Sequence, residues 1–121
     1  MKKVLSFILF LFVSCPVFAD NGQTAITLEH KGDGHLEHFI PADMPEAYFD
    51  DVAMEIIIVG DGFADYYDVE IVSLGSMLTV IGTQIDGYGD SIDVSSLPDG
   101  DYRLVITSSN NNVFEGDFAI E

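Results

Sequence analysis

The final stretch of the chain, from Ser91 to Glu121, constrains the fold most strongly. It reads SIDVSSLPDGDYRLVITSSNNNVFEGDFAIE. The segment from Leu97 to Asp101 is a dense turn signal, because proline presets φ for a turn and glycine takes a positive φ without steric cost. Apolar residues then alternate with mostly polar ones, which is the period of a half-buried strand. The stretch therefore predicts strand, tight turn, strand, polar turn and strand, which need a second layer to bury their apolar face.

Two residues in this stretch carry more specific expectations. Tyr102 follows the Pro-Gly turn, and two interpretations of it are open. It is either an ordinary core aromatic or part of a Greek-key corner, in which the tyrosine hydroxyl donates a hydrogen bond to the backbone a few residues upstream. Gly116 interrupts the last strand, and we expect it to mark a β-bulge.

Further strand-like segments precede this unit. The segment 54–59 is the most β-branched run in the chain and is apolar on both faces over its second half, so we expect a central strand there. Residues 41–45 read as a rigid connector, and 82–89 as a Gly-rich loop. The other expected strands are 24–29, 47–49, 67–72 and 77–81. About seven short strands without an amphipathic helix predict an all-β fold, an antiparallel immunoglobulin-like β-sandwich.

The chain begins with a predicted secretion signal. Lys2 and Lys3 form a short positive region, the run 4–13 is nearly all apolar, and Val17-Phe18-Ala19 predicts cleavage after Ala19. The apolar run is too short to span a bilayer comfortably. We therefore expect a signal peptide over 1–19 and a single β-sandwich domain over 20–121. The protein is expected to be secreted or periplasmic, without membrane insertion after cleavage.

The lone cysteine, Cys15, leaves an alternative open. Val13-Ser14-Cys15 contains part of a lipobox, so lipidation of Cys15 competes with plain cleavage after Ala19. In the cleaved form no cysteine remains and no disulfide can form, so the hydrophobic core alone must hold the fold.

Charge narrows the classes of partner. Cleavage removes Lys2 and Lys3, which leaves Lys31 and Arg103 against 21 acidic residues, a formal charge of −19 (two minus 21) for the mature chain. Such a surface repels phosphate backbones and anionic membranes, so we expect no nucleic acid partner. The charge either serves solubility by keeping the sheet edges of different molecules apart, or favours cations and basic partners.

The apolar and turn residues together resemble a known family. Their frame, I-x-L … P … I-x-I … V-x-I … L-P-x-G-x-Y-x-L-x-I-T … G-x-F-x-I, is similar to small secreted proteins of Bacteroides and relatives, the domain of unknown function 3244. This resemblance implies a sandwich fold and export, and it implies no activity. The L-P-x-G-x-Y part is also similar to the C-terminal sorting domains of type IX secretion. The matching residues are Ile26, Leu28, Ile56, Ile58, Val69, Ile71, Leu97, Pro98, Gly100, Tyr102, Leu104, Ile106, Thr107, Gly116, Phe118 and Ile120.

Two groups of side chains could hold a metal ion. His30, His35 and His38 lie close together in the sequence beside Glu29 and Glu37, and imidazole with carboxylate suits Zn²⁺. Their spacing matches no established zinc signature, and histidines in a polar loop are more often solvated. Aspartates could offer oxygen ligands to Ca²⁺, but no EF-hand pattern is present. We therefore expect no metal and no cofactor. The aspartates are Asp61, Asp65 and Asp68, or Asp86 with Asp90.

Catalysis is not expected. Nucleophilic catalysis needs a base oriented beside the nucleophile, yet the mature chain has no cysteine and no G-x-S-x-G elbow. Tyr66, Tyr67 and Tyr88 lie in or near turns and could stack on sugar rings, although Tyr67 belongs to the core by alternation. Asp90-Ser91-Ile92 resembles the acceptor of the O-glycosylation system of the same bacterial group; the alternative is an ordinary Ser91 where a turn becomes a strand.

The sequence thus predicts an exported, non-catalytic interaction module that binds an unknown protein or glycan through loops or a sheet edge. The alternative is a sorting or accessory domain of a secretion system. Cell fractionation separates these two hypotheses, because the second requires surface delivery that depends on the type IX apparatus.

Overall fold

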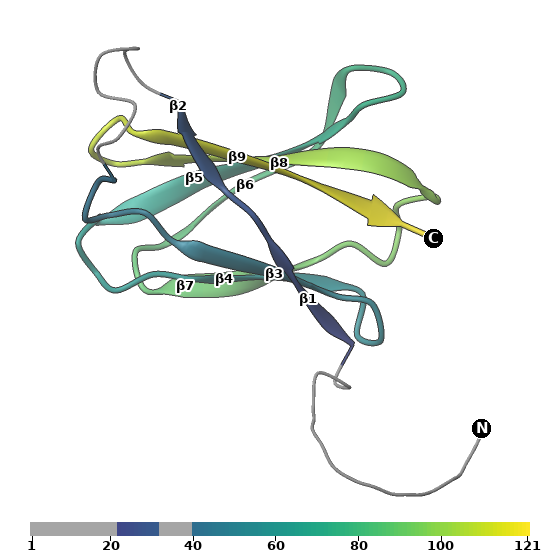
Figure 1. Cartoon of the computed structure of the whole chain (residues 1–121), viewed down its shortest axis with the longest axis horizontal. Helices are drawn as coiled ribbons and strands as arrows, with labels where there is room; N and C mark the ends of the chain where they lie inside the picture. The colour runs from purple at the N-terminus through teal and green to yellow at the C-terminus, as the bar shows by residue number, and fades with distance from the viewer. Residues whose placement is uncertain (1–21, 32–39) are drawn as a thin grey trace, which may run out of the picture.

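The chain folds as two antiparallel β-sheets packed face to face (Figure 1), which confirms the predicted fold class. The computed structural model describes residues 22–31 and 40–121, and among these it contains nine strands. No helix long and apolar enough to cross a membrane occurs in these described ranges. The predicted signal peptide over 1–19 lies outside the described residues, as do Cys15, His35, Glu37 and His38.

Each sheet has a simple order. The four-stranded sheet runs β1-β3-β4-β7 and the five-stranded sheet runs β2-β9-β8-β5-β6, with every neighbouring pair antiparallel. The strands of the first sheet are β1 (Gln23–Ile26), β3 (Glu46–Asp50), β4 (Glu55–Val59) and β7 (Gly89–Asp93). Those of the second are β2 (Glu29–Lys31), β5 (Tyr66–Ser73), β6 (Leu78–Asp86), β8 (Gly100–Ser108) and β9 (Val113–Ile120).

The core lies between the sheets and follows the predicted alternation. In β8, every second residue from Tyr102 to Ser108 is buried, while the residues between them face outward. Strand β4 lies between β3 and β7, so the prediction of a central strand at 54–59 is confirmed. The largest fully buried side chains form one cluster: Tyr67, Phe114, Ile56, Ile58, Ile71, Leu104, Ile106, Val69 and Val94.

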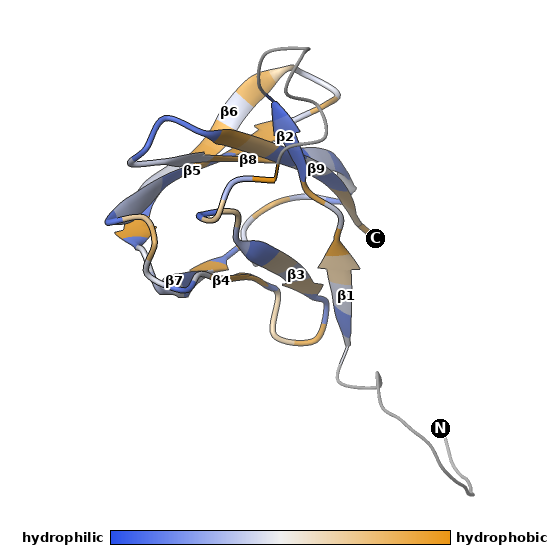
Figure 2. Cartoon of the chain, turned by 60° about the vertical axis from the view of Figure 1, so that its left-hand side comes forward, coloured by the Kyte–Doolittle hydropathy of each residue, from blue (hydrophilic) through white to orange (hydrophobic). Residues whose placement is uncertain are grey.

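The prediction of a single first strand over 24–29 is wrong. The segment is divided into β1 and β2, which pair with β3 in one sheet and β9 in the other. Figure 2 shows the two short strands following one another along one side of the sandwich. The division explains Gly116, because a Cβ there would lie 2.5 Å from the Thr27 carbonyl oxygen as the chain crosses between the sheets.

The bulge expected at Gly116 is also wrong. Pairing between β8 and β9 stays in register through Leu104 and Gly116, so no residue is inserted there. The register shift occurs instead between β5 and β6, at Ile71 and Val72. Gly116 therefore serves a close backbone approach rather than a bulge.

The expected Gly-rich loop over 82–89 is wrong for most of its length. Strand β6 continues through Gly82 to Asp86, and β7 begins at Gly89, so only two residues remain between them. Pairing with β5 keeps the segment extended, because each residue from Gly82 to Asp86 has a partner between Tyr66 and Glu70. The glycine content alone suggested a loop, but pairing with the neighbouring strand keeps this segment in a β-strand.

Tyr102 forms the predicted corner. Its side chain is buried against Phe118, and its hydroxyl donates a hydrogen bond to the carbonyl oxygen of Pro98, four residues upstream. The corner interpretation is confirmed, and the ring is at the same time part of the core. The corner fixes the connection through which the chain passes from β7 in one sheet to β8 in the other.

Candidate binding surface

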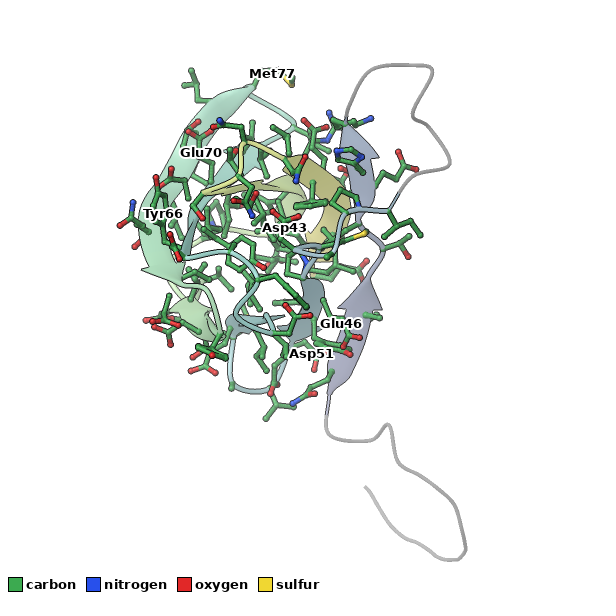
Figure 3. All side chains as sticks on the ribbon, turned by 90° about the vertical axis from the view of Figure 1, so that its left-hand side faces the viewer. Asp43, Glu46, Asp51, Tyr66, Glu70 and Met77 are labelled. Carbon is green, nitrogen blue, oxygen red and sulfur yellow. The ribbon has the colours of Figure 1, made fainter. Side chains whose placement is uncertain are left out.

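Four connections meet at one end of the sandwich. They are 40–45 before β3, 60–65 between β4 and β5, 87–88 between β6 and β7, and 109–112 between β8 and β9. The amides of Gly60 and Gly62 donate to the carbonyls of Tyr88 and Gly87, at 3.1 and 3.2 Å. Figure 3 looks onto this end, with Asp43 near the centre of the view. We name it the loop-end surface.

Asp43 is the buried centre of the loop-end surface. Its residue is only 3% exposed, and its carboxylate accepts hydrogen bonds from the side-chain amides of Asn110 at 3.1 Å and Asn112 at 3.0 Å. Asn110 also donates to the carbonyl of Phe63 at 3.4 Å. A buried carboxylate is costly unless hydrogen-bonded. These bonds meet that requirement and join three of the four connections.

The same contacts set the protonation of Asp43. Burial by itself would raise the pKa of this carboxyl, but hydrogen bonds from Ser108, Asn110 and Asn112 outweigh burial and hold the pKa below its ordinary value. The group is therefore ionised at neutral pH although amides and a hydroxyl, rather than a cation, surround it. The sequence does not single out Asp43, since an aspartate between two prolines is typical of an ordinary turn.

Tyr67 ties the core to the same network. Its ring is fully buried, and its hydroxyl donates to the backbone carbonyl of Asp43 at 2.7 Å. Burial, followed by the nearby charges of Asp43 and Asp61, raises the pKa of Tyr67 to about 12. The expectation that Tyr67 belongs to the core is confirmed, so it is not a platform for a sugar ring.

Two aromatic rings of the described residues are largely exposed on the loop-end surface. Phe63 is 65% exposed and Tyr88 is 72% exposed. Gly62 leaves no room for a side chain because the ring of Tyr88 occupies that space, 2.6 Å from where a Cβ would lie. Tyr66, at the margin of Figure 3, is partly exposed as well. The sequence singled out Tyr66 and Tyr88, but not Phe63, whose signal was an aromatic residue directly after the Gly60-Asp61-Gly62 turn.

Phe63 borders a shallow hollow of about 220 Å³. An apolar ring beside amide groups is an arrangement suited to a ligand with both apolar and hydrogen-bonding faces. The side-chain amides of Asn110 and Asn112 already donate to Asp43. A ligand in the hollow would therefore contact the Phe63 ring and backbone groups. The lining residues are Pro41, Ala42, Asp43, Phe63, Asn110 and Asn112.

Three candidate metal ligands are nowhere brought together among the described residues. Among residues 22–31 and 40–121, no three His, Cys, Asp or Glu side chains are placed to share an ion. Asp86 accepts from the Tyr88 amide at 2.8 Å, and Asp68 accepts from the Gln84 side chain at 3.0 Å. Asp61 and Asp90 likewise accept from nearby backbone amides. These carboxylates therefore cap turns or bridge strands. His30, the described histidine, lies against Phe114 with ring centroids 5.6 Å apart.

A second hollow, of about 380 Å³, lies beside β2 and β9 and gathers both basic residues of the described ranges. Arg103 donates to Asp117 through two nitrogens, at 2.8 and 3.2 Å, and Lys31 pairs with Glu29 at 3.6 Å. The hydrogen bond from Arg103 lowers the pKa of Asp117. Because each cation already has a carboxylate partner, this groove offers less to a ligand than the loop-end surface.

Ser91, the candidate glycosylation site, lies on β7 at the edge of the four-stranded sheet and is exposed. We expect the protein from its native host to have a mass above that of residues 20–121. Intact mass spectrometry measures this, and a Ser91→Ala variant should return the mass to that of the unmodified polypeptide. An unmodified mass for the native protein would remove the hypothesis.

The fold and its site define an immunoglobulin-like β-sandwich with an aromatic loop end. The chain is similar in structure to a protein of the DUF3244 family from Bacteroides vulgatus, whose crystal structure shows an immunoglobulin-like β-sandwich fold. The TM-score is 0.64 at 16% sequence identity, over 82% of this chain and 99% of that chain. The resemblance inferred from the sequence is thus confirmed at the level of the fold.

Comparisons with family models and with curated proteins give no match. The similarity to type IX sorting domains stays a prediction from the L-P-x-G-x-Y motif.

Proposed function

We propose that this protein is an exported, non-catalytic binding module that takes a protein or glycan ligand on its loop-end surface. The observation that carries the proposal is the pairing of two features. Phe63 and Tyr88 present exposed rings, and the loops that hold them are fixed by hydrogen bonds. The buried Asp43 network holds the loop of Phe63, and the backbone bonds from Gly60 and Gly62 tie the 87–88 connection to that loop. Loops that are held in place before binding lose little conformational entropy when a ligand arrives, so more of the contact energy appears as affinity.

The surroundings of these rings favour some ligands over others. Asp61, Asp65 and Asp86 are exposed on the same connections or beside them. They repel anionic ligands, so the surface suits a neutral glycan or a neutral to basic protein segment. Aromatic residues carry much of the binding energy at interfaces because a large apolar area is buried with few rotatable bonds.

A double variant, Phe63→Ala with Tyr88→Ala, tests the proposal. We expect it to lose affinity by about tenfold or more, as for residues at the centre of an interface. The measurement is titration calorimetry against a panel of neutral and basic oligosaccharides, with surface plasmon resonance against proteins of the native envelope. Both side chains are exposed, so thermal unfolding should stay close to that of the unsubstituted protein.

The matched control is Val52→Ala, which removes an exposed apolar side chain from the turn between β3 and β4, at the opposite end of the sandwich. We expect this variant to bind like the unsubstituted protein. Equal binding by the double variant and the unsubstituted protein would contradict the proposed site. Binding that Val52→Ala weakens equally would place the ligand elsewhere.

A further inference from the structure

The four edge strands of the two sheets are not protected alike. Strands β1, β2 and β7 contain four, three and five residues, and both β2 and β7 carry charged side chains. Strand β6 contains nine residues, and its one charge is the final residue, Asp86. An edge strand exposes unpaired backbone groups to any other strand, and natural proteins shorten or charge their edges to prevent pairing. Here β1 and β2 are short and β7 is charged, whereas β6 is long and carries no charge before its last residue.

The absence of charge extends well beyond β6. From Ile71 to Ile85 no charged residue occurs, in a chain with 21 acidic ones. This stretch comprises the end of β5, the turn after it and β6 as far as Ile85, and the tip of this hairpin projects beyond the rest of the sandwich in Figure 1. Met77, at the tip in Figure 3, is exposed together with Leu78 and Val80, which are 66% and 42% exposed. Apolar residues gathered on a projecting hairpin mark an interaction site.

We propose that β6 is a self-association edge, at which a second copy of this chain pairs its own β6 in the antiparallel direction. The five-stranded sheets of the two copies then form one continuous sheet across a two-fold axis. Such a contact is self-complementary, because the same segment lies on both sides of it. Main-chain hydrogen bonds supply the pairing, as in other cases of strand addition.

Charge argues for a second copy at this particular edge. Two strongly acidic molecules repel one another, and pairing through β7 would bring Asp90 and Asp93 close to the same residues of the other copy. Along β6, Leu78 to Ile85 face no like charge in a self-pairing. Gly82 also favours pairing at β6. Nothing lies within 4 Å of where its Cβ would be, so the backbone of another strand can approach closely.

Sedimentation equilibrium of the protein recovered from cells that express the full chain tests the pairing. We expect a monomer–dimer equilibrium that shifts towards dimer as ionic strength rises from about 0.05 M to about 0.5 M, because salt screens the repulsion between the acidic copies. A protein that remains monomeric at high salt and at the highest soluble concentration would overturn the proposal. So would a dimer that loosens as salt is added.

Matched substitutions locate the contact. Val80→Glu on β6 should weaken the dimer about tenfold or more, because like charges then meet across the axis. Val59→Glu adds the same charge at a similarly exposed valine of β4, 46% against 42%, and should leave the dimer intact apart from a small general effect of net charge. Thr83→Glu, at another exposed position of β6, repeats the test if Val80→Glu misfolds.

Two results would contradict either the location of the dimer contact at β6 or the identity of its partner as a second copy of this chain. If Val59→Glu and the β6 variants weaken the dimer equally, the contact lies elsewhere. If the protein is monomeric alone but forms a stoichiometric complex with another protein that Val80→Glu abolishes, then β6 pairs with a foreign strand and not with a second copy. The loop-end variant Phe63→Ala with Tyr88→Ala should not affect the dimer, so the two proposals fail or succeed separately.

Discussion

Substituting Gly89 by alanine is expected to destabilise the fold by about 3 kcal/mol or more, from backbone strain combined with overpacking. Gly89 has a φ of +102°, which alanine rarely adopts, and a Cβ there would collide with the carbonyl oxygen of Ile58 on β4. Either the pairing of β7 with β4 must open, or the backbone must rotate to another conformation. Urea unfolding of the variant and the unsubstituted protein measures the loss.

Gly82→Ala is the control within the same Gly-rich segment. A Cβ at Gly82 meets no atom within 4 Å, and Gly82 is not among the positions with positive φ. We expect its free energy of unfolding to change little, or to rise slightly because alanine restricts the unfolded chain. The unfolding should be followed at low protein concentration, so that association through β6 does not contribute. Equal losses at Gly82 and Gly89 would contradict the role assigned to the β4–β7 approach.

The second large effect is expected at Asp43. Asp43→Asn should destabilise the protein by roughly 2–4 kcal/mol, because an amide replaces a charged acceptor of several hydrogen bonds in a buried position. The new NH₂ group would face the NH₂ groups of Asn110 and Asn112, and at least one donor would lose its partner. Asp99→Asn, at an exposed turn at the other end, removes the same charge and should change stability little.

The pH dependence gives Asp43 a separate signature. Its pKa in the folded state lies below the ordinary value of 3.8. The stability that the ionised carboxylate supplies is therefore fully present above that value, and it is lost as the pH falls through the lower pKa of the folded state.

The difference in unfolding free energy between the unsubstituted protein and Asp43→Asn should accordingly be constant near neutral pH and shrink below about pH 4. Comparing the two proteins cancels the other carboxylates, which titrate in the same range. A difference that does not change between neutral pH and pH 3 would show that Asp43 does not act through its charge.

The residues of the loop-end surface could be predicted from the sequence only in part. Tyr88 was singled out because it lies in a turn, and Tyr67 was assigned to the core by its alternation with Asp68 and Glu70. Asp43 could not be recognised, because its role depends on Asn110 and Asn112, which are 67 and 69 residues distant along the chain. Phe63 left a local signal, an aromatic residue directly after a glycine-containing turn, but its exposure follows only from the folded structure. A contact between loops leaves no periodic trace in either loop.

Which strands form the edges of the sheets could likewise not be predicted from the sequence. The excess of acidic residues was evident, and it suggested protection against pairing between edge strands. Only the strand order shows that the uncharged segment from Ile71 to Ile85 includes an outermost strand, whereas the charged segment at β7 forms the edge of the other sheet.

The amino-acid sequence by itself determined the fold class, because alternating apolar residues and Pro-Gly turns are local signals that only stacked sheets satisfy. It also offered the corner at Tyr102 as one of two interpretations, because the two residues that share the hydrogen bond are only four residues apart. The tertiary structure decided the division of the first strand between two sheets, the roles of Gly82, Gly89 and Gly116, and the burial of Asp43. Each of these depends on which distant backbone passes nearby, and that is fixed only when the two sheets pack.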